Sequence, residues 1–328
     1  MKKILGLDIG GTKCAVTLGK GTLEPGHETI EIMERVFFPT ATYNSPEEVI
    51  DRACEEMQKL LEQYEEHKSD ISSIGISCGG PLDGTRGLIL SPPNLPGWDE
   101  FPVVQLVQDK MGIKAKLQND ADACALAEWK FGAGKGCKNM IFLTFGTGFG
   151  AGLILNGELY TGASNMAGEI GHIRVEEFGP VGYGKSGSME GFCSGGGIAR
   201  LAQSKALEKL QRGERVSFCE GIDQLDQITA KSVAQAADTG DETALEVYEI
   251  SGRFLGKGLS ILIDLLNPER IVIGSIFARS QHLLWPHAEQ VIRKETLRYS
   301  ANACSVVPAA LGDNVGDYAA LSIALYED

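Results

Sequence analysis

The chain has 328 residues, of which 43% are hydrophobic and 23% are charged, and its formal net charge is −14 at neutral pH. This length suits two domains of ordinary size, and no apolar run approaches the roughly 20 residues that a membrane-spanning helix needs. The acidic balance argues against a nucleic-acid partner, because such partners are bound mainly by clustered Lys and Arg.

Both the amino terminus and the cysteines indicate a cytoplasmic protein. The first strand turns to Asp8 and glycines after a few apolar residues, whereas a secretory signal would continue as a longer apolar region. The eight cysteines are scattered and form no C-x-x-C pair. We therefore expect reduced, mostly buried thiols, with neither a disulfide framework nor an all-cysteine metal site.

Strands and a helix alternate in the first part of the chain. "KKILGLDIG" (residues 2–10) predicts a strand that enters a Gly-Gly-Thr turn, and "CAVTLG" (14–19) predicts a second strand. Ser45 is expected to cap a helix with Pro46 at its first position and Glu48 completing a capping box. "ISSIGISC" (71–78) predicts a short buried strand, whereas "SPPNLPGW" (91–98) has too many prolines for regular structure.

The remaining elements continue this alternation. Residues 119–131 predict a helix capped by Asn119, with Asp122 on its surface. "IFLTFGTGFGAGLIL" (141–155) repeats the opening pattern of strand, glycine turn and strand. Helical patterns follow around 242–266 and 313–326, with the strand "RIVIGS" (270–275) between them. The order predicts an α/β architecture built from two related halves.

The two glycine turns are candidate phosphate sites, because glycine lets backbone N–H groups approach a phosphate closely. A lone glycine hairpin is more often a simple tight turn, but one turn in each half favours a triphosphate clamp. Asp8 ends the first strand, where its carboxylate could hold Mg²⁺ or merely cap the turn. The candidate nucleotide-binding residues are Gly10, Gly11, Thr12, Gly146, Thr147, Gly148 and Gly150.

The segment "GPVGYGKS" (179–186) matches the P-loop pattern G-x-x-x-x-G-K-S. A P-loop must open a helix with an apolar face, but the following "GSMEGFCSGGG" (187–197) contains five glycines and predicts no such helix. We therefore interpret Lys185 as a solvated loop lysine.

Six segments together resemble the ROK family (repressor, open reading frame, kinase). "LGLDIGGTK" and "LTFGTGFGAGLIL" resemble its two phosphate motifs, "SPPNLPGW" and "LQNDADACALAEW" its sugar-site segments, "GEIGH" its E-x-G-H signature and "NPERIVIGS" its adenosine-side strand. The resemblance implies two actin-like ATPase (ribonuclease H-like) domains with a cleft between them. It places a small domain at 1–117, joined by a carboxyl-terminal helix at about 313–328, and a large domain at 118–312.

The resemblance also implies an ATP-dependent sugar kinase that uses Mg²⁺ and forms a homodimer. Family repressors carry an amino-terminal winged helix, and the chain starts at the kinase motif, so we expect a kinase. Asp120 matches the family's catalytic base, and the first turn of its helix favours a carboxylate. Lys13 completes the first phosphate motif. The residues that match sugar contacts are Asn94, Asn119, Glu169, His172, Glu190 and the backbone near Gly80.

The resemblance implies a zinc loop after E-x-G-H, but this chain departs from it. Aligned on Glu190, the three cysteine positions fall on Val181, Tyr183 and Ser188, which leaves His172 alone. We therefore predict no structural zinc, and we expect packing, with Tyr183 as a candidate, to hold the loop.

Several alternatives remain open. Glucose, phosphorylated at its 6-hydroxyl, is the first choice of substrate. N-acetylglucosamine, N-acetylmannosamine and fructose are alternatives, because the polar residues are shared. A non-catalytic sugar sensor would need neither Asp120 nor the two glycine turns. A P-loop NTPase would depend on Lys185.

Overall fold

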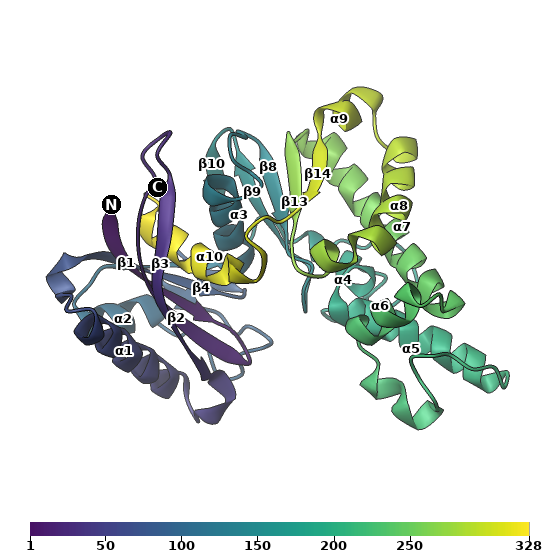
Figure 1. Cartoon of the computed structure of the whole chain (residues 1–328), viewed down its shortest axis with the longest axis horizontal. Coiled ribbons are helices and arrows are strands. Elements are labelled where there is room, and N and C mark those ends of the chain that lie inside the picture. The colour runs from purple at the N-terminus through teal and green to yellow at the C-terminus, as the bar shows by residue number, and fades with distance from the viewer. Residues whose placement is uncertain (328) are drawn as a thin grey trace. The chain divides into compact units, whose positions relative to one another are not determined.

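A computed structural model of the chain describes residues 1–327, except for the side chain of Asp313 (Figure 1). The chain forms two five-stranded sheets and divides into two compact units. Unit 1 comprises Met1–Lys138, Gly152–Ala167 and the residues from Ala310 on, and unit 2 comprises Asn139–Ala151 and Gly168–Ala309. These units are defined by packing, and the division after residue 117 stays a prediction.

The main sheet of unit 1 has the order β3-β2-β1-β4-β7, in which β1, β2 and β3 pair antiparallel while β4 and β7 continue parallel to β1. Its strands are β1 (Lys2–Ile9), β2 (Lys13–Thr22), β3 (Thr29–Pro39), β4 (Ile71–Cys78) and β7 (Ala115–Asn119). The helices are α1 (Pro46–Gln63), α2 (Val103–Met111), α3 (Asp120–Phe131) and α10 (Val315–Leu325). Two small hairpins join β5 (Leu82–Asp83) to β6 (Leu88–Ile89) and β9 (Ala151–Leu155) to β10 (Glu158–Tyr160).

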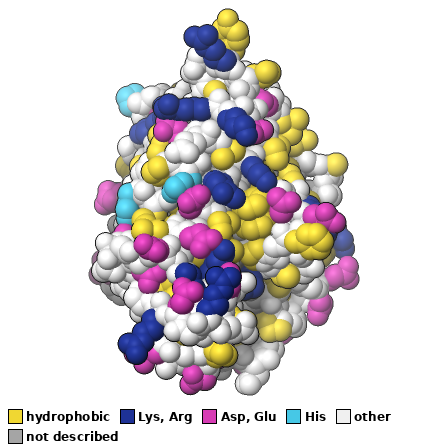
Figure 2. All heavy atoms as spheres, turned by 90° about the vertical axis from the view of Figure 1, so that its right-hand side faces the viewer, with side chains coloured by type: hydrophobic (Ala, Val, Ile, Leu, Met, Phe, Trp, Pro, Cys, Tyr) yellow, Lys and Arg dark blue, Asp and Glu magenta, His cyan; other side chains and the backbone are white. Residues whose placement is uncertain are grey.

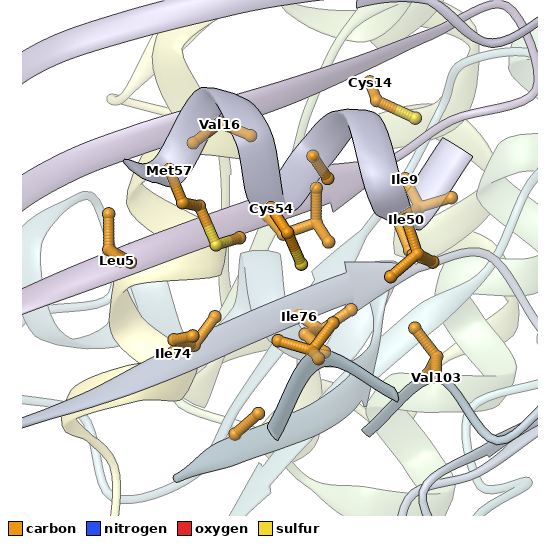
Figure 3. Packing of buried hydrophobic residues seen from close by; sticks show 14 of the residues in the cluster. Leu5, Ile9, Cys14, Val16, Ile50, Cys54, Met57, Ile74, Ile76 and Val103 are labelled. Atoms are coloured by element: carbon orange, nitrogen blue, oxygen red, sulfur yellow. The ribbon is translucent and has the colours of Figure 1, made fainter. Parts of the chain in front are cut away.

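One face of this sheet packs on α1 and α2 (Figure 1). Leu5, Leu7 and Ile9 alternate along β1 on that face, and Figure 3 shows Ile50, Cys54 and Met57 of α1 packed into the same cluster. The cap of α1 is confirmed, since the Ser45 side chain accepts a hydrogen bond from the Glu48 N–H. The reciprocal half of the predicted capping box is wrong, because the Glu48 carboxylate accepts from the Asn44 N–H instead.

The other face of the sheet packs on α10. Ile4, Gly6 and Asp8 alternate onto that face, and Ile4 forms a small core with Leu321 and Leu325 of α10. A Cβ at Gly6 would lie 2.9 Å from the Cβ of Ala320, so the glycine lets the helix lie close to the strand. The helix therefore begins near Asp8, since a Cβ at Gly316 would lie 3.1 Å from Asp8 Oδ2.

In unit 2 the strands β8 (Met140–Leu143), β13 (Arg270–Ile273) and β14 (Ser305–Pro308) form a parallel ladder. A separate hairpin joins β11 (Val181–Gly182) and β12 (Lys185–Ser186). The helices are α4 (Met189–Phe192), α5 (Gly195–Gln211), α6 (Ala230–Asp238), α7 (Glu242–Leu266), α8 (Ile276–Glu295) and α9 (Arg298–Ala303). The predicted helix around 242–266 and the predicted strand at 270–275 are thereby confirmed.

The expectation of reduced, mostly buried thiols agrees with the structure. All eight cysteines are free, and most are buried. Within residues 1–327, no helix combines the length and the apolar character needed to cross a membrane. Figure 2 shows one face of the molecule, on which acidic, basic and hydrophobic side chains are interspersed.

Candidate active site

The carboxyl ends of β1, β4 and β7 meet at one edge of the sheet in unit 1. Asp8 lies opposite Ser77 in the β1–β4 ladder, and Cys78 lies opposite Asn119 in the β4–β7 ladder. Ligands of open α/β sheets bind outside the carboxyl ends of parallel strands. This edge is therefore the candidate site of unit 1.

The first glycine turn (residues 10–13) continues directly from β1. The Gly10 N–H donates to the Lys13 carbonyl at 3.1 Å, and the Thr40 hydroxyl donates to the Gly10 carbonyl at 2.6 Å. A Cβ at Gly11 would lie 2.5 Å from the carbonyl oxygen of Asn94. Because Gly11 has no side chain, its backbone can lie directly against the backbone of Asn94. The predicted phosphate turn thus contacts a predicted sugar-binding residue.

Asn94 is exposed on a loop whose neighbours anchor it. Leu95 and Trp98 are buried in the core of unit 1, and the Ser91 N–H donates to the Trp98 carbonyl at 2.9 Å. The irregular structure predicted for residues 91–98 is confirmed. This arrangement fixes the backbone while leaving the amide of Asn94 available for a ligand.

Asn119 and Asp120 stand at the amino terminus of α3. The predicted cap is confirmed, since Asn119 Oδ1 accepts a hydrogen bond from the Ala121 N–H at 2.9 Å. Gly79 and Gly80 lie beside them, because a Cβ at Gly79 would lie 3.9 Å from Asp120 Oδ2 and one at Gly80 would lie 3.0 Å from Asn119 Nδ2. The structure thus brings together Asp120, Asn119 and the backbone at Gly80.

The charge of Asp120 acts on the carboxyl group of Asp8. Burial and then the charge of Asp120 raise the pKa of Asp8 to about 6, while a hydrogen bond from Ser77 opposes the rise. Desolvation by neighbouring protein atoms raises the pKa of Asp120 although the residue as a whole is exposed, and the hydrogen bond from Ala121 opposes this. Two carboxyl groups are therefore held close together at a cost in electrostatic free energy.

This pair fits a hard divalent cation such as Mg²⁺, which prefers carboxylate oxygens and water. A cation would offset the repulsion that raises the pKa of Asp8. Lys13 lies nearby, since its charge lowers the pKa of Asp8, and its ammonium group lies 4.4 Å from the centroid of the Phe37 ring.

The second glycine turn (residues 144–150) belongs to unit 2. The Thr144 N–H donates to the Gly150 carbonyl at 2.9 Å, and the Gly146 N–H donates to the Gly148 carbonyl at 3.1 Å. The Gly195 N–H, at the start of α5, donates to the Gly146 carbonyl at 2.8 Å. Thr147 is exposed at the tip of the turn, where its N–H and hydroxyl are available for a phosphate.

Three predicted sugar contacts lie around this turn within unit 2. Glu169 and His172 are exposed on the GEIGH segment (residues 168–172), which contains the short 3₁₀ helix η3 (Ile170–His172). Glu190 lies in the first turn of α4, and its Oε2 accepts a hydrogen bond from the Phe149 N–H at 3.1 Å. The structure therefore places the Glu190 side chain against the second glycine turn, and it places Glu169 and His172 on a segment whose backbone contacts that turn at Gly171.

The P-loop-like segment forms the hairpin of β11 and β12. No helix opens at Lys185 or Ser186, since the four-residue α4 begins at Met189 and α5 begins at Gly195. Lys185 lies in a strand, whereas a P-loop lysine lies where a helix begins. Its Nζ donates to the His172 carbonyl at 2.7 Å in an exposed hydrogen bond, and its side chain is half-buried, so the predicted solvated lysine is held to the neighbouring segment at one end.

Val181, Tyr183 and Ser188, which align with the zinc-binding cysteines of the family, are not cysteines here, and Ser188 and Tyr183 make other contacts. Ser188 caps α4 by accepting from the Gly191 N–H, and its hydroxyl lies 3.3 Å from the Gly182 carbonyl. The Tyr183 ring lies edge-on to the His172 ring, with centroids 6.0 Å apart. Within residues 1–327 no cluster of three or more His, Cys, Asp or Glu could hold a metal. These residues do not fit a zinc site, and the absence of zinc stays a prediction.

The sequence model of the ROK family matches residues 4–327. The chain belongs to the ROK family. A glucokinase from Halalkalibacterium halodurans is 32% identical over 314 residues, which cover 95% of this chain and 92% of that protein. The structure of a ROK family glucokinase from Streptomyces griseus in complex with glucose and AMPPNP matches with a TM-score of 0.77 at 29% identity and covers 97% of both chains.

The proteins similar to this chain also include a repressor. An N-acetylglucosamine repressor from Escherichia coli O157:H7 is 30% identical over 254 residues, which cover 77% of this chain and 60% of that protein. The predicted α/β, actin-like fold class is confirmed by the two sheets and by the likeness to ROK kinase structures.

Two buried carboxylates of this ROK protein do not follow from the sequence pattern. Asp122 was expected on the surface but is buried, so that prediction is wrong. Glu128 of α3 is completely buried, and its carboxylate accepts backbone hydrogen bonds from Ala133, Ala310 and Leu311. No local pattern marks either residue, since nothing in the sequence of α3 shows what packs around Asp122 and Glu128.

Proposed function

We propose that the protein is an ATP-dependent hexose kinase that transfers the γ-phosphoryl group to the 6-hydroxyl of glucose. The proposal depends most on one observation: Asp120 stands at the amino terminus of α3, at the same sheet edge as Asp8 and the first glycine turn. The similarity to glucokinases supports glucose as the sugar.

The reaction exchanges one phosphorus–oxygen bond for another. The sugar oxygen forms a bond to the γ-phosphorus, the bond to the bridging oxygen of ADP breaks, and the hydroxyl proton passes to a base. Asp120 is the proposed base, because a carboxylate with a raised pKa orients the hydroxyl and accepts its proton more readily. Bound Mg²⁺, held by Asp8, would offset the charge of the phosphates.

The remaining residues are proposed to bind and orient the two substrates. The backbone N–H groups of the first and second glycine turns, with Thr12, Lys13 and Thr147, would hold the phosphates. The polar side chains on each unit would bind the sugar hydroxyls, because paired hydrogen bonds discriminate hydroxyl patterns well. These proposed sugar contacts are Asn94, Asn119, Glu169, His172 and Glu190, together with the Gly80 backbone.

A coupled ADP-release assay with a panel of hexoses and N-acetylhexosamines tests the proposal. We expect sugar-dependent ADP formation with glucose, reduced by about 10²–10⁴-fold in Asp120→Asn. Asp122→Asn is no suitable control because Asp122 is buried, so Asp226→Asn, at an exposed aspartate of unit 2, serves instead. ADP formation without sugar, or full activity in Asp120→Asn, would contradict the proposal.

The same panel decides between the alternatives. N-acetylglucosamine, N-acetylmannosamine or fructose as the preferred substrate would correct the sugar but keep the enzyme class. Sugar binding without ADP release would favour the non-catalytic sensor. The similarity to an N-acetylglucosamine repressor is the reason to test this alternative. The homodimer implied by the family is also a proposal, and analytical ultracentrifugation tests it.

A further inference from the structure

One carboxylate joins a proposed sugar contact to the second glycine turn. Glu190 Oε2 accepts the Phe149 N–H at 3.1 Å, inside unit 2. Gly148 makes this contact possible, since a Cβ at that position would lie 3.0 Å from the same oxygen. Glu190 Oε1 has no hydrogen-bond partner in the part of the chain that the structure describes. One oxygen therefore holds the turn while the other is available to a ligand.

The GEIGH segment touches the same hairpin. A Cβ at Gly171 would overlap the Phe149 carbonyl, so the glycine allows this segment to lie directly against the turn. The Ala151 N–H donates to the Gly168 carbonyl at 2.8 Å. Both polar backbone groups of Phe149 thus face segments that carry proposed sugar contacts, the N–H facing Glu190 and the carbonyl facing Gly171.

We propose that Glu190 couples sugar binding to nucleotide binding within unit 2, an inference that rests on the proposed function. A sugar hydroxyl bonded to Oε1 holds the carboxylate in one rotamer. Because Oε2 is then fixed, it holds the Phe149 N–H and with it the turn that receives the phosphates. A turn that is already ordered binds the nucleotide more tightly, and by linkage the nucleotide tightens sugar binding by the same factor.

Calorimetry measures this coupling directly. The dissociation constant of AMPPNP with Mg²⁺ is measured with and without saturating D-glucose, and that of D-glucose with and without AMPPNP. We expect each ligand to tighten the other by about 5-fold or more. In Glu190→Gln the factor should fall below about half of the wild-type value, because the neutral amide holds the turn and the hydroxyl less firmly.

His172→Gln is the matched control. Its side chain is a proposed sugar contact of the same unit, and it packs against Tyr183 rather than against the turn. This variant should bind D-glucose more weakly but keep the wild-type coupling factor. An unchanged factor in Glu190→Gln, or an equal loss in His172→Gln, would overturn the proposal.

Hydrogen exchange supplies a second, independent readout of the same coupling. Saturating D-glucose, without nucleotide, should slow amide exchange in a peptide covering residues 144–151 of the wild-type protein, and Glu190→Asp should lose this effect because its shorter side chain does not reach Phe149. Unchanged exchange in the wild type at saturating D-glucose would overturn the coupling while leaving the proposed kinase activity intact. A protein that binds neither ligand would refute both.

Discussion

The Glu128 carboxylate accepts a hydrogen bond from the Leu311 N–H at 2.8 Å, across 183 residues of sequence. It also accepts from the N–H groups of Ala310, at 3.2 Å, and Ala133, at 2.7 Å. Glu128 lies in α3, the helix that begins at Asp120. One buried side chain therefore fixes the helix of the proposed base against two loops of unit 1.

Glu128→Gln should destabilise the protein by about 1–3 kcal/mol, because one acceptor oxygen is replaced by an NH₂ group that faces buried N–H donors. Urea denaturation monitored by circular dichroism measures the change. Glu62→Gln, on the exposed side of α1, is the control and should stay within about 0.5 kcal/mol of wild type. Equal stability of Glu128→Gln and wild type would show that the three hydrogen bonds contribute little.

Asp8→Asn should stabilise the fold at pH 7.5 by about 1–2 kcal/mol while abolishing turnover. The pKa of Asp8 is raised to about 6, so its ionised form costs stability above that pH. As the pH falls through 6 the folded state takes up a proton and the cost declines, reaching zero below the unfolded pKa of 3.8. Urea denaturation at pH 7.5 and at pH 5 measures the free energy of unfolding of Asp8→Asn relative to wild type. The stabilisation should be smaller at pH 5, and a stabilisation that does not depend on pH would contradict the raised pKa of Asp8.

Arg35 and Asp317 should show a positive coupling energy. Asp317 is buried, and it accepts hydrogen bonds from Arg35 Nη1 at 2.5 Å and from the Thr17 hydroxyl at 3.0 Å. A double-mutant cycle with Arg35→Met and Asp317→Asn should give about 1 kcal/mol or more. The exposed pair Arg293–Glu289 is the control, at about 0.5 kcal/mol or less. Similar values for the two pairs would show that burial of Asp317 does not strengthen its interaction.

Lys185→Met should weaken sugar binding and leave the nucleotide largely unaffected. Its ammonium group bonds the His172 carbonyl, so its loss should raise the KM for sugar by up to about tenfold, with the KM for ATP unchanged. Lys294→Met, at an exposed lysine, is the control. If Lys185→Met instead lost both turnover and ATP binding, Lys185 would have a P-loop role.

Metal chelation should not unfold the protein. The loop at 179–190 is held by its own hydrogen bonds, including the Gly187 N–H to the Pro180 carbonyl and the Ser186 hydroxyl to the Gly179 carbonyl. After treatment with 1,10-phenanthroline the Tm should shift by about 1 °C or less, whereas removal of a structural zinc usually unfolds its loop. Elemental analysis should find far less than one zinc per chain. A stoichiometric zinc and a large fall in Tm would refute the prediction.

The sequence by itself determined the elements and the local chemistry at their ends. Strand β4 and helix α7 lie where the apolar patterns place them, and Ser45 and Asn119 cap the helices that they precede. These features depend on hydrogen bonds and side-chain spacing over a few residues, so they can be predicted without knowing the fold. The two glycine turns were found in the same way.

The tertiary structure alone decided which distant groups meet. The contacts of Glu128 with Leu311, of Glu190 with Phe149 and of Lys185 with His172 join segments whose proximity no local pattern encodes. Burial of Asp122 and Glu128 likewise depends on how α3 packs within unit 1. A helical period shows which residues share a face, but the surroundings of that face follow from how the whole chain packs.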